Sequence, residues 1–238
     1  MKKILIALAT LTTLISCTKK TDEISDYNLT ITGNVDGLKQ GKLYFQKEID
    51  SALVTIDSVI VDGDSKFVKK FKIDSPELIF LNLERHNSNN IDNSLVFFAE
   101  PGEININTTL QQFYYNAKIT GSKNHDLYEQ YRQLVSRYTN ENAILIGLNV
   151  IATKEKNNAR LDSIQKAADR LIAQRYLAVA NFVKNNPDKE ISALLIVDEI
   201  PNIAKPLLDT ITKNITPEVY NSKYGQELTK LLKVRENE

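Results

Sequence analysis

The pair Asp57-Ser58 places a carboxylate next to a hydroxyl, and both groups occur in the active sites of nucleophilic hydrolases. A serine becomes a nucleophile only when a base takes its proton and a third group orients that base. No histidine or lysine stands close to the pair in the sequence to act as this base. We therefore interpret Asp57 and Ser58 as structural residues of a strand that leads into a turn.

Metal binding is the second chemistry that the residue types suggest. Asp62-Gly63-Asp64-Ser65 clusters oxygen atoms that suit calcium, but the later ligands of a calcium loop are missing. Asp-Gly between two strands is already a hairpin signal, so we interpret this segment as a hairpin. The two histidines, His86 and His125, stand alone, whereas zinc sites need three or four ligands. We expect no metal and no cofactor.

Cys17 is the only cysteine, and its surroundings are those of an acylation site. Two lysines precede the apolar run 4–15, which is too short to span a bilayer and fits a signal peptide. The run ends in Leu14-Ile15-Ser16-Cys17, which resembles the lipobox of bacterial lipoproteins. We expect residues 1–16 to be removed, Cys17 to carry diacylglycerol and a further acyl chain such as palmitate, and residues 17–26 to form a tether. The alternative is an ordinary secretory signal with a chance cysteine.

The charge balance argues against nucleic acid as a partner. Lys2 and Lys3 are two of the 30 basic side chains, so 28 remain after cleavage against 30 acidic ones, a formal charge of −2. No basic cluster could follow a phosphate backbone, which excludes nucleic acid as a partner. With no second cysteine, stability must come from an apolar core, and 42% apolar residues are enough to build one.

Residues 27–121 show the period of strands. Apolar side chains occupy alternate positions from Leu29, and turns are marked at Asp36-Gly37, Asp62-Gly63 and Pro101-Gly102. The expected strands are 29–35, 41–46, 53–61, 66–73, 78–83, 95–99, 103–107 and 113–119. This pattern predicts an antiparallel β-sandwich or barrel-like domain over residues 27–121.

Residues 122–238 show the longer period of helices. Apolar side chains recur at spacings of three and four from Leu127 to Tyr138 and from Leu161 to Phe182. The polar stretch 154–160 between them predicts an antiparallel helical hairpin whose apolar seam packs within the chain. The alternative is an oligomer-forming coiled coil, which we disfavour because the seam spans too few heptads. Shorter helices follow, divided by Pro187, Pro201, Pro206 and Pro217, and the last is expected over 218–233. The fold class is thus α+β.

Two polar or aromatic segments of the β half are candidate binding elements. His86–Ser94 is the most polar stretch there, and we expect a long loop, the kind of element that often carries binding residues. Tyr114-Tyr115 beside Phe113 offers rings for stacking on a sugar or a partner. We favour an edge strand with one buried aromatic face.

Several motifs together resemble a domain of unknown function found in envelope lipoproteins of the Bacteroidetes type. Thr32-Gly33 to Gly37 with Gly41 to Phe45 is similar to its opening hairpin, and Phe97 to Ile104 to its later strand pair. Phe182 to Pro187, with Tyr224-Gly225 further on, resembles the helical linker that follows this domain. The motif residues to which the resemblance assigns structural roles are Gly33, Asp57, Ser58, Asp62, Gly63, Phe67, Pro101, Gly102 and Gly121.

The resemblance implies a place in the envelope but no redox activity. In that family the linker leads to a thioredoxin-like domain, and no cysteine follows Cys17 here to supply a thiolate or a resolving thiol. We expect a non-catalytic binding or scaffolding lipoprotein, not an enzyme, on the periplasmic side of the outer membrane, with an unidentified envelope protein as partner. The alternative is an accessory role beside a separately encoded thioredoxin-like protein.

Four Asp-Ser/Thr-apolar triplets also resemble the O-glycosylation sites of this lineage. Such triplets also occur by chance.

Overall fold

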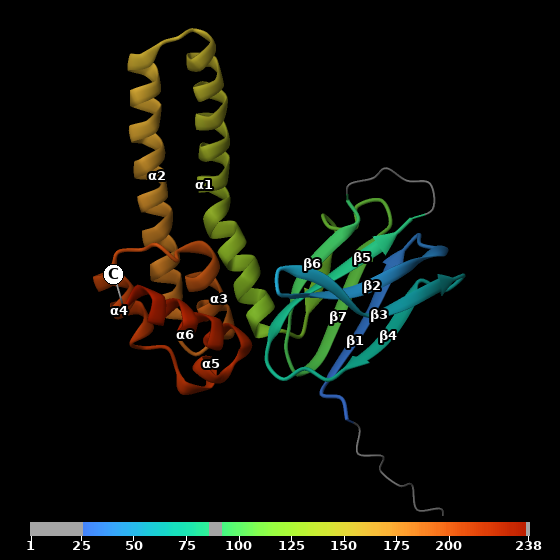
Figure 1. Ribbon diagram of the computed structural model, residues 1–238. Coiled ribbons are helices and arrows are strands. Elements are labelled where there is room, and N and C mark those ends of the chain that lie inside the picture. Colours follow the sequence, from blue (N-terminus) through green and yellow to red (C-terminus); the bar gives the residue numbers. More distant parts are fainter. Residues whose placement is uncertain (1–25, 86–91, 237–238) are drawn as a thin grey trace, which may run out of the picture.

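A computed structural model describes residues 26–85 and 92–236, in which strands precede helices (Figure 1). The strands are β1 (Leu29–Asp36), β2 (Gln40–Ile49), β3 (Ala52–Asp62), β4 (Lys66–Phe71), β5 (Glu77–Glu84), β6 (Ser94–Ala99), β7 (Gly102–Thr109) and β8 (Lys118–Thr120). The helices are α1 (Lys123–Lys154), α2 (Asn158–Asn185), α3 (Glu190–Glu199), α4 (Lys205–Thr212), α5 (Pro217–Asn221) and α6 (Lys223–Arg235). No helix in these ranges has both the length and the apolar character of a bilayer span.

The strands form two four-stranded sheets around a shared core. One sheet has the order β4-β1-β7-β8 and the other the order β3-β2-β5-β6. All neighbours are antiparallel except β1 and β7, which run parallel. The alternation expected from Leu29 is confirmed, since Leu29, Ile31 and Val35 are all fully buried. The predicted class, an antiparallel sandwich or barrel-like domain followed by helices, is therefore confirmed as a sandwich, although the parallel pair β1–β7 was not predicted.

The predicted hairpin pairings are wrong, although the turns exist. Asp36-Gly37 joins β1 to β2, Asp62-Gly63 joins β3 to β4, and Pro101-Gly102 joins β6 to β7, and each pair of strands belongs to different sheets. A turn signal shows that the chain reverses, but it does not show whether the returning strand pairs or crosses to the facing sheet. The tightest real hairpin, β2–β3, turns at Asp50 and Ser51, which adopt positive φ without glycine.

The strand expected over 113–119 is also wrong. Only β8, which pairs with β7, remains of it, and the residues before β8 form turns. Phe113 is fully buried in the sandwich core. A single aromatic ring can fill the core from a turn as well as from a strand. The sequence pattern of so short a segment does not distinguish these two structures.

The helical hairpin is confirmed. Helices α1 and α2 run antiparallel and extend well beyond the rest of the molecule (Figure 1). At its base the hairpin packs on the short helices, and the apolar cluster there includes Tyr131, Leu171 and Val183. The seam from Leu161 to Phe182 thus contributes to an intramolecular core, as predicted.

The single last helix predicted over 218–233 is wrong in one respect, because Ser222 interrupts it. Ser222 is extended (φ −74°, ψ 171°), ends α5 and caps α6 by accepting from the N–H of Gly225 at 3.2 Å. A Cβ at Gly225 would lie 1.9 Å from the carbonyl oxygen of Val219, so this close turn excludes side chains there. The apolar stripe of α6 packs on the other helices, and Leu228 is fully buried.

Helix α6 also contacts the β domain. The Tyr224 ring meets Phe98 edge to face with centroids 5.8 Å apart, and the Tyr224 hydroxyl accepts from the N–H of Leu78 at 2.9 Å. Lys223 Nζ lies 3.0 Å from Glu77 Oε2, which is nearly buried. Phe98 and Leu78 thereby join the apolar cluster of the helices, while the remaining core side chains of the sandwich form a second cluster.

The same contact region gathers negative charge. Asp198 of α3, Glu227 of α6 and Glu48 of β2 line a hollow of about 270 Å³. Partial burial, followed by the charges of Glu227, Glu199 and Glu48, raises the pKa of Asp198 to about 6. The ionised carboxylate therefore destabilises the folded chain.

We predict that Asp198→Asn stabilises the protein in a pH-dependent way. Above pH 6 Asp198 is ionised in both the folded and the unfolded chain, and only the folded chain bears the repulsion. After screening by solvent, we expect Tm at pH 8 to rise by roughly 2–4 °C, a gain that vanishes as the pH falls below about 4. The measurement is thermal unfolding followed by circular dichroism between pH 4 and 8.

The matched control is Asp162→Asn, which removes an exposed carboxylate paired with Lys166 at 2.8 Å. It should leave Tm unchanged or lower it slightly at pH 8. A pH-independent gain for Asp198→Asn, or a loss at pH 8, would contradict the assignment.

Candidate functional site

A carboxylate of the β domain holds the start of α1. Glu100, in the connection between β6 and β7, accepts from the backbone N–H of Lys123 at 2.6 Å and from that of Asn124 at 3.3 Å. Ser122, the N-cap residue, accepts from the N–H of His125 at 3.0 Å. The first N–H groups of α1 are thus paired, and a negative charge lies at the positive end of the helix dipole.

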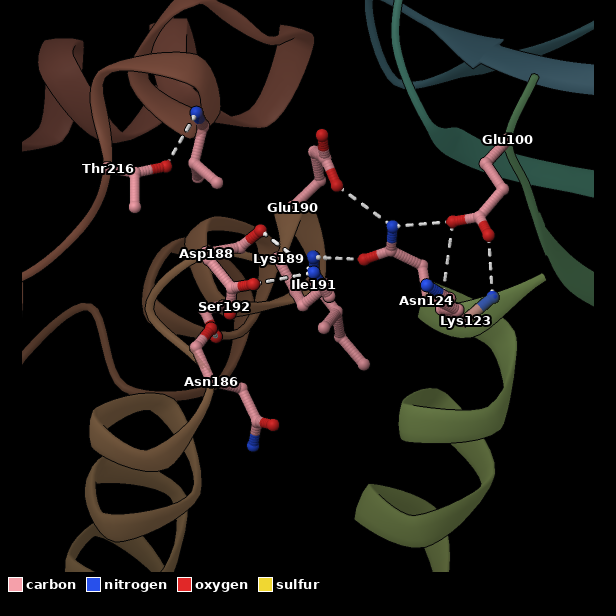
Figure 2. Close-up of polar contacts among 11 residues, drawn as sticks. Glu100, Lys123, Asn124, Asn186, Asp188, Lys189, Glu190, Ile191, Ser192 and Thr216 are labelled. Atoms are coloured by element: carbon pink, nitrogen blue, oxygen red, sulfur yellow. Dashed lines mark hydrogen bonds and ion pairs between the residues drawn. The ribbon is translucent and has the colours of Figure 1, made fainter.

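The side chain of Asn124 extends this contact to α3, as Figure 2 shows. Its Nδ2 donates to Oε2 of Glu100 and to Oε2 of Glu190, both at 2.8 Å, and its Oδ1 accepts from the N–H of Ile191 at 3.1 Å. Asn124 is only 2% exposed. A single buried amide therefore joins the β domain, α1 and α3, and we call this contact the Asn124 junction.

The start of α3 is fixed independently on its other side (Figure 2). The Ser192 hydroxyl donates to the carbonyl oxygen of Asn186 at 2.6 Å, and Lys189 pairs with Asp188 at 2.6 Å. The hydrogen bond between these two charged groups lowers the pKa of Asp188 and raises the pKa of Lys189. These contacts help to fix the turn that leads into α3, the helix that carries Glu190 and the N–H of Ile191.

Beside the Asn124 junction lies a cleft of about 630 Å³ between α1 and the segment that joins β7 to β8. Its volume falls within the range of small-molecule sites. Helix α1 contributes one face to the cleft, and the β domain contributes aromatic, apolar and polar side chains to the other wall. The lining residues are Leu95, Tyr114, Tyr115, Ala117, Lys118, Ile119, Thr120, His125, Asp126, Glu129 and Arg132.

The wall that carries the tyrosines is anchored rather than loose. Phe113 is fully buried, and its carbonyl oxygen accepts from the Thr108 hydroxyl at 2.6 Å. The N–H of Tyr114 donates to Asp92 Oδ1 at 2.7 Å. Tyr115 stands edge to face on Tyr114, with centroids 5.3 Å apart, and is 78% exposed. The loop therefore presents the Tyr115 ring to solvent from a fixed base.

The opposite wall carries an ion pair that is partly desolvated. Arg132 lies 2.7 Å from Glu129, and its guanidinium stands 4.9 Å from the centre of the Tyr114 ring. Burial raises the pKa of Glu129 and lowers the pKa of Arg132. With Lys118 and Asp126, the cleft holds two positive and two negative groups. Such a surface suits a ligand that has polar groups of both kinds.

His125 takes part in the contact between the two halves. Its Nδ1 accepts from the backbone N–H of Phe98 at 3.5 Å, and the residue is 4% exposed. Burial lowers the pKa of His125, against an opposing effect of Asp126. The neutral imidazole therefore acts as an acceptor that ties α1 to β6. Across residues 26–85 and 92–236, no three His, Cys, Asp or Glu side chains gather as a metal site would require.

The predicted pair Asp57-Ser58 lies on β3, away from the cleft. Asp57 Oδ1 accepts from the N–H of Ser58 at 2.6 Å, and Lys69 of β4 pairs with Asp57 at 2.9 Å. Burial raises the pKa of Asp57, but the hydrogen bonds from Lys69 and Ser58 outweigh it and lower the pKa. Asp57 thus links the two sheets through Lys69, a lysine that the sequence analysis did not connect with it.

Two of the predicted motif residues mark close approaches in the frame. A Cβ at Gly33 would lie 2.3 Å from the ring of Phe67, which is itself buried against Phe45. At Gly121, where φ is +99°, a Cβ would lie 1.9 Å from the carbonyl oxygen of Glu103. Gly121 therefore lets the chain leave β8 tightly and enter α1 next to the cleft.

Other predicted residues have different outcomes. Cys17, residues 1–16 and His86 lie outside the described residues. The interpretation of Tyr114 and Tyr115 as a buried strand face is wrong, because the segment turns around Phe113. Sequence reasoning missed Asn124, Glu129 and Arg132. The usable signals were the carboxylate of Glu100 before Pro101-Gly102 and the spacing of Asp126, Glu129 and Arg132 along one helix.

Comparison with family models matches residues 29–128 to DUF4369, described as a domain of unknown function. The match covers all eight described strands and the first turns of α1, including Asn124. The predicted resemblance of the β half to a domain of unknown function is thereby confirmed. Searches of curated proteins and of solved structures give no match.

We predict that Asn124→Ala destabilises the protein. The substitution removes both donors and the acceptor, which leaves Glu190 and the N–H of Ile191 without this partner. The free energy of unfolding should fall by about 2–4 kcal/mol, measured by urea denaturation. Asn140→Ala, at an exposed position of the same helix, should change it by less than about 0.5 kcal/mol. Equal effects of the two substitutions would show that the Asn124 junction contributes nothing special.

Proposed function

We propose that this protein is a lipid-anchored, non-catalytic binding protein of the cell envelope, and that its ligand occupies the cleft beside the Asn124 junction. The observation that carries the proposal is the Tyr115 ring, which an anchored loop holds 78% exposed. A large ring exposed on a fixed base, opposite charged side chains, is typical of recognition surfaces.

The chemistry of the walls favours a polar ligand with a flat apolar face. Tyr115 and Tyr114 offer ring surface, while Lys118 and Asp126 offer a donor and an acceptor. Arg132 is already held by Glu129 and Tyr114, so it would bind without losing further side-chain freedom. Binding, rather than covalent chemistry, agrees with a site whose charged groups are paired or solvated.

The membrane attachment rests on Cys17. The lipobox-like sequence, the short apolar run before it and the polar tether after it agree with acylation. Thr18 does not resemble an inner-membrane retention signal, and Lys19 and Lys20 differ from the acidic stretch of surface-exported lipoproteins. We therefore propose the periplasmic face of the outer membrane.

The binding proposal predicts a site-specific cross-link. The photoreactive amino acid p-benzoylphenylalanine at position 115 should form an adduct when cells producing the full chain are irradiated. The matched control is position 60 on β3, because Ile60 is 77% exposed and lies outside the cleft. Mass spectrometry of the purified protein should show an adduct at 115 that is weak or absent at 60, and lost when Arg132→Ala is added. Equal labelling at both positions, or none at 115, would refute the proposal.

The anchoring proposal predicts the fate of Cys17→Ser. Without the thiol no thioether to diacylglycerol forms, so the variant should stay at the precursor mass and incorporate no labelled palmitate. The control Ser16→Ala keeps a small residue before the cut and should be acylated like the wild type. Label in Cys17→Ser would contradict the assignment.

A further inference from the structure

The helical hairpin carries an open groove that begins on α1 beyond the residues of the cleft. On one face, between α1 and α2, two hollows of about 300 and 500 Å³ share Glu141 and Gln174 and so form one continuous groove. Its floor is formed by side chains of the hairpin seam, such as Leu145 and Leu171. In Figure 1 the far end of the hairpin extends away from both the sheets and the short helices.

The walls of the groove expose apolar side chains. Ile144 of α1 is 63% exposed, and Leu177 of α2 is 53% exposed. The stretch 143–153 of α1 contains no charged residue at all. Two helices alone cover only the faces that they turn toward each other, so this surface stays in contact with water in a single chain. Such contiguous apolar surface is typical of an interface.

The charges of the groove identify the occupant. Glu141 lies on the α1 wall and Arg170 on the α2 wall, and neither forms an ion pair within the described residues. Arg137, the third charged lining residue, is already occupied, since its guanidinium lies 4.5 Å from the centre of the Tyr138 ring. Among the described residues, an acidic side chain without an ion pair, Glu141, therefore lies on the α1 wall beside Arg137, and a basic one without an ion pair, Arg170, lies on the α2 wall.

We propose that a second copy of this chain covers the groove, so that two hairpins form a four-helix bundle. With a two-fold axis along the groove, α1 of each copy lies over α2 of the other. Each Glu141 then comes within about one helical turn of Arg170 of the other copy, and the apolar walls cover each other. A two-fold arrangement makes the Glu141–Arg170 contact twice, which suits a groove that carries these two charges on opposite walls.

The size of the groove limits the area of the dimer interface. Two helices about 10 Å wide, over some 15 residues, give a footprint of roughly 400–500 Å² per copy. That is below the ~800 Å² per partner of a standard stable interface. An interface of this size is typical of a weak, reversible dimer, and we expect a Kd in the micromolar range.

Analytical ultracentrifugation of residues 18–238, which contain every described residue, tests the proposal between about 1 and 300 µM. We expect a monomer–dimer equilibrium and a Kd at least about tenfold higher for Ile144→Asp, which buries a charge in the interface. Ile60→Asp, at an even more exposed apolar position on β3, should leave the Kd unchanged. A monomer at all concentrations, or a dimer that Ile144→Asp does not weaken, would overturn the proposal.

A charge exchange tests the geometry. Glu141→Arg and Arg170→Glu should each raise the Kd, since each variant places like charges together, and the double variant should return to within about threefold of the wild type. Circular dichroism checks that each variant is folded. If the loss of dimerisation free energy in the double variant equals the sum of the losses in the two single variants, the pairing is refuted. If the chain is monomeric and sediments with phosphatidylethanolamine–phosphatidylglycerol vesicles, and Ile144→Asp abolishes this binding, the groove binds lipid instead and the proposal is overturned.

Discussion

The buried side-chain amide of Asn124 is the contact on which the arrangement of the molecule depends. It joins a turn of the sandwich, the first turn of α1 and the first turn of α3, and it uses both of its N–H donors and its carbonyl oxygen. A buried polar group of this kind destabilises the folded state when some of its hydrogen bonds are missing. When it is fully hydrogen-bonded, it favours one arrangement of the elements that it joins. The sandwich and the helices have separate apolar clusters, so the Asn124 junction, with the Tyr224 contacts, fixes how the two halves lie together.

The proposed functions follow from that fixed arrangement. The cleft has one wall from the β domain and one from α1, so its shape exists only if the two halves keep their relative position. Glu129 and Arg132 lie one and two turns beyond Asn124 on the same helix. The hairpin then carries the second surface away from the first. The proposed ligand binding near the sheets and the proposed pairing of hairpins thus use separate surfaces of the molecule.

Local features of the fold were predictable, and long-range ones were not. The alternation from Leu29 and the spacing from Leu161 to Phe182 reflect which side chains are buried within a single element. Such patterns were therefore sufficient to predict the strand-rich and helical halves. The pairing of the strands was not predicted correctly. A turn motif such as Asp62-Gly63 indicates that the chain reverses, but it does not indicate which strand lies next to the returning one. Asn124 was missed since an asparagine in a first helical turn has many local explanations, and its partner Ile191 lies 67 residues away. Tyr115 was misplaced because its neighbour Phe113, not a strand face, fills the core.

Native-state hydrogen exchange at the amides of Lys123, Asn124 and Ile191 tests the central claim most directly, because these are the N–H groups held by Glu100 and Asn124. If the Asn124 junction makes the two halves one unit, these amides exchange only through global unfolding. Their free energies of exchange then equal those of core amides such as Ile31 and Ile196. Exchange through a local opening, at a free energy well below the core value, would show that the halves separate while folded and would contradict the account.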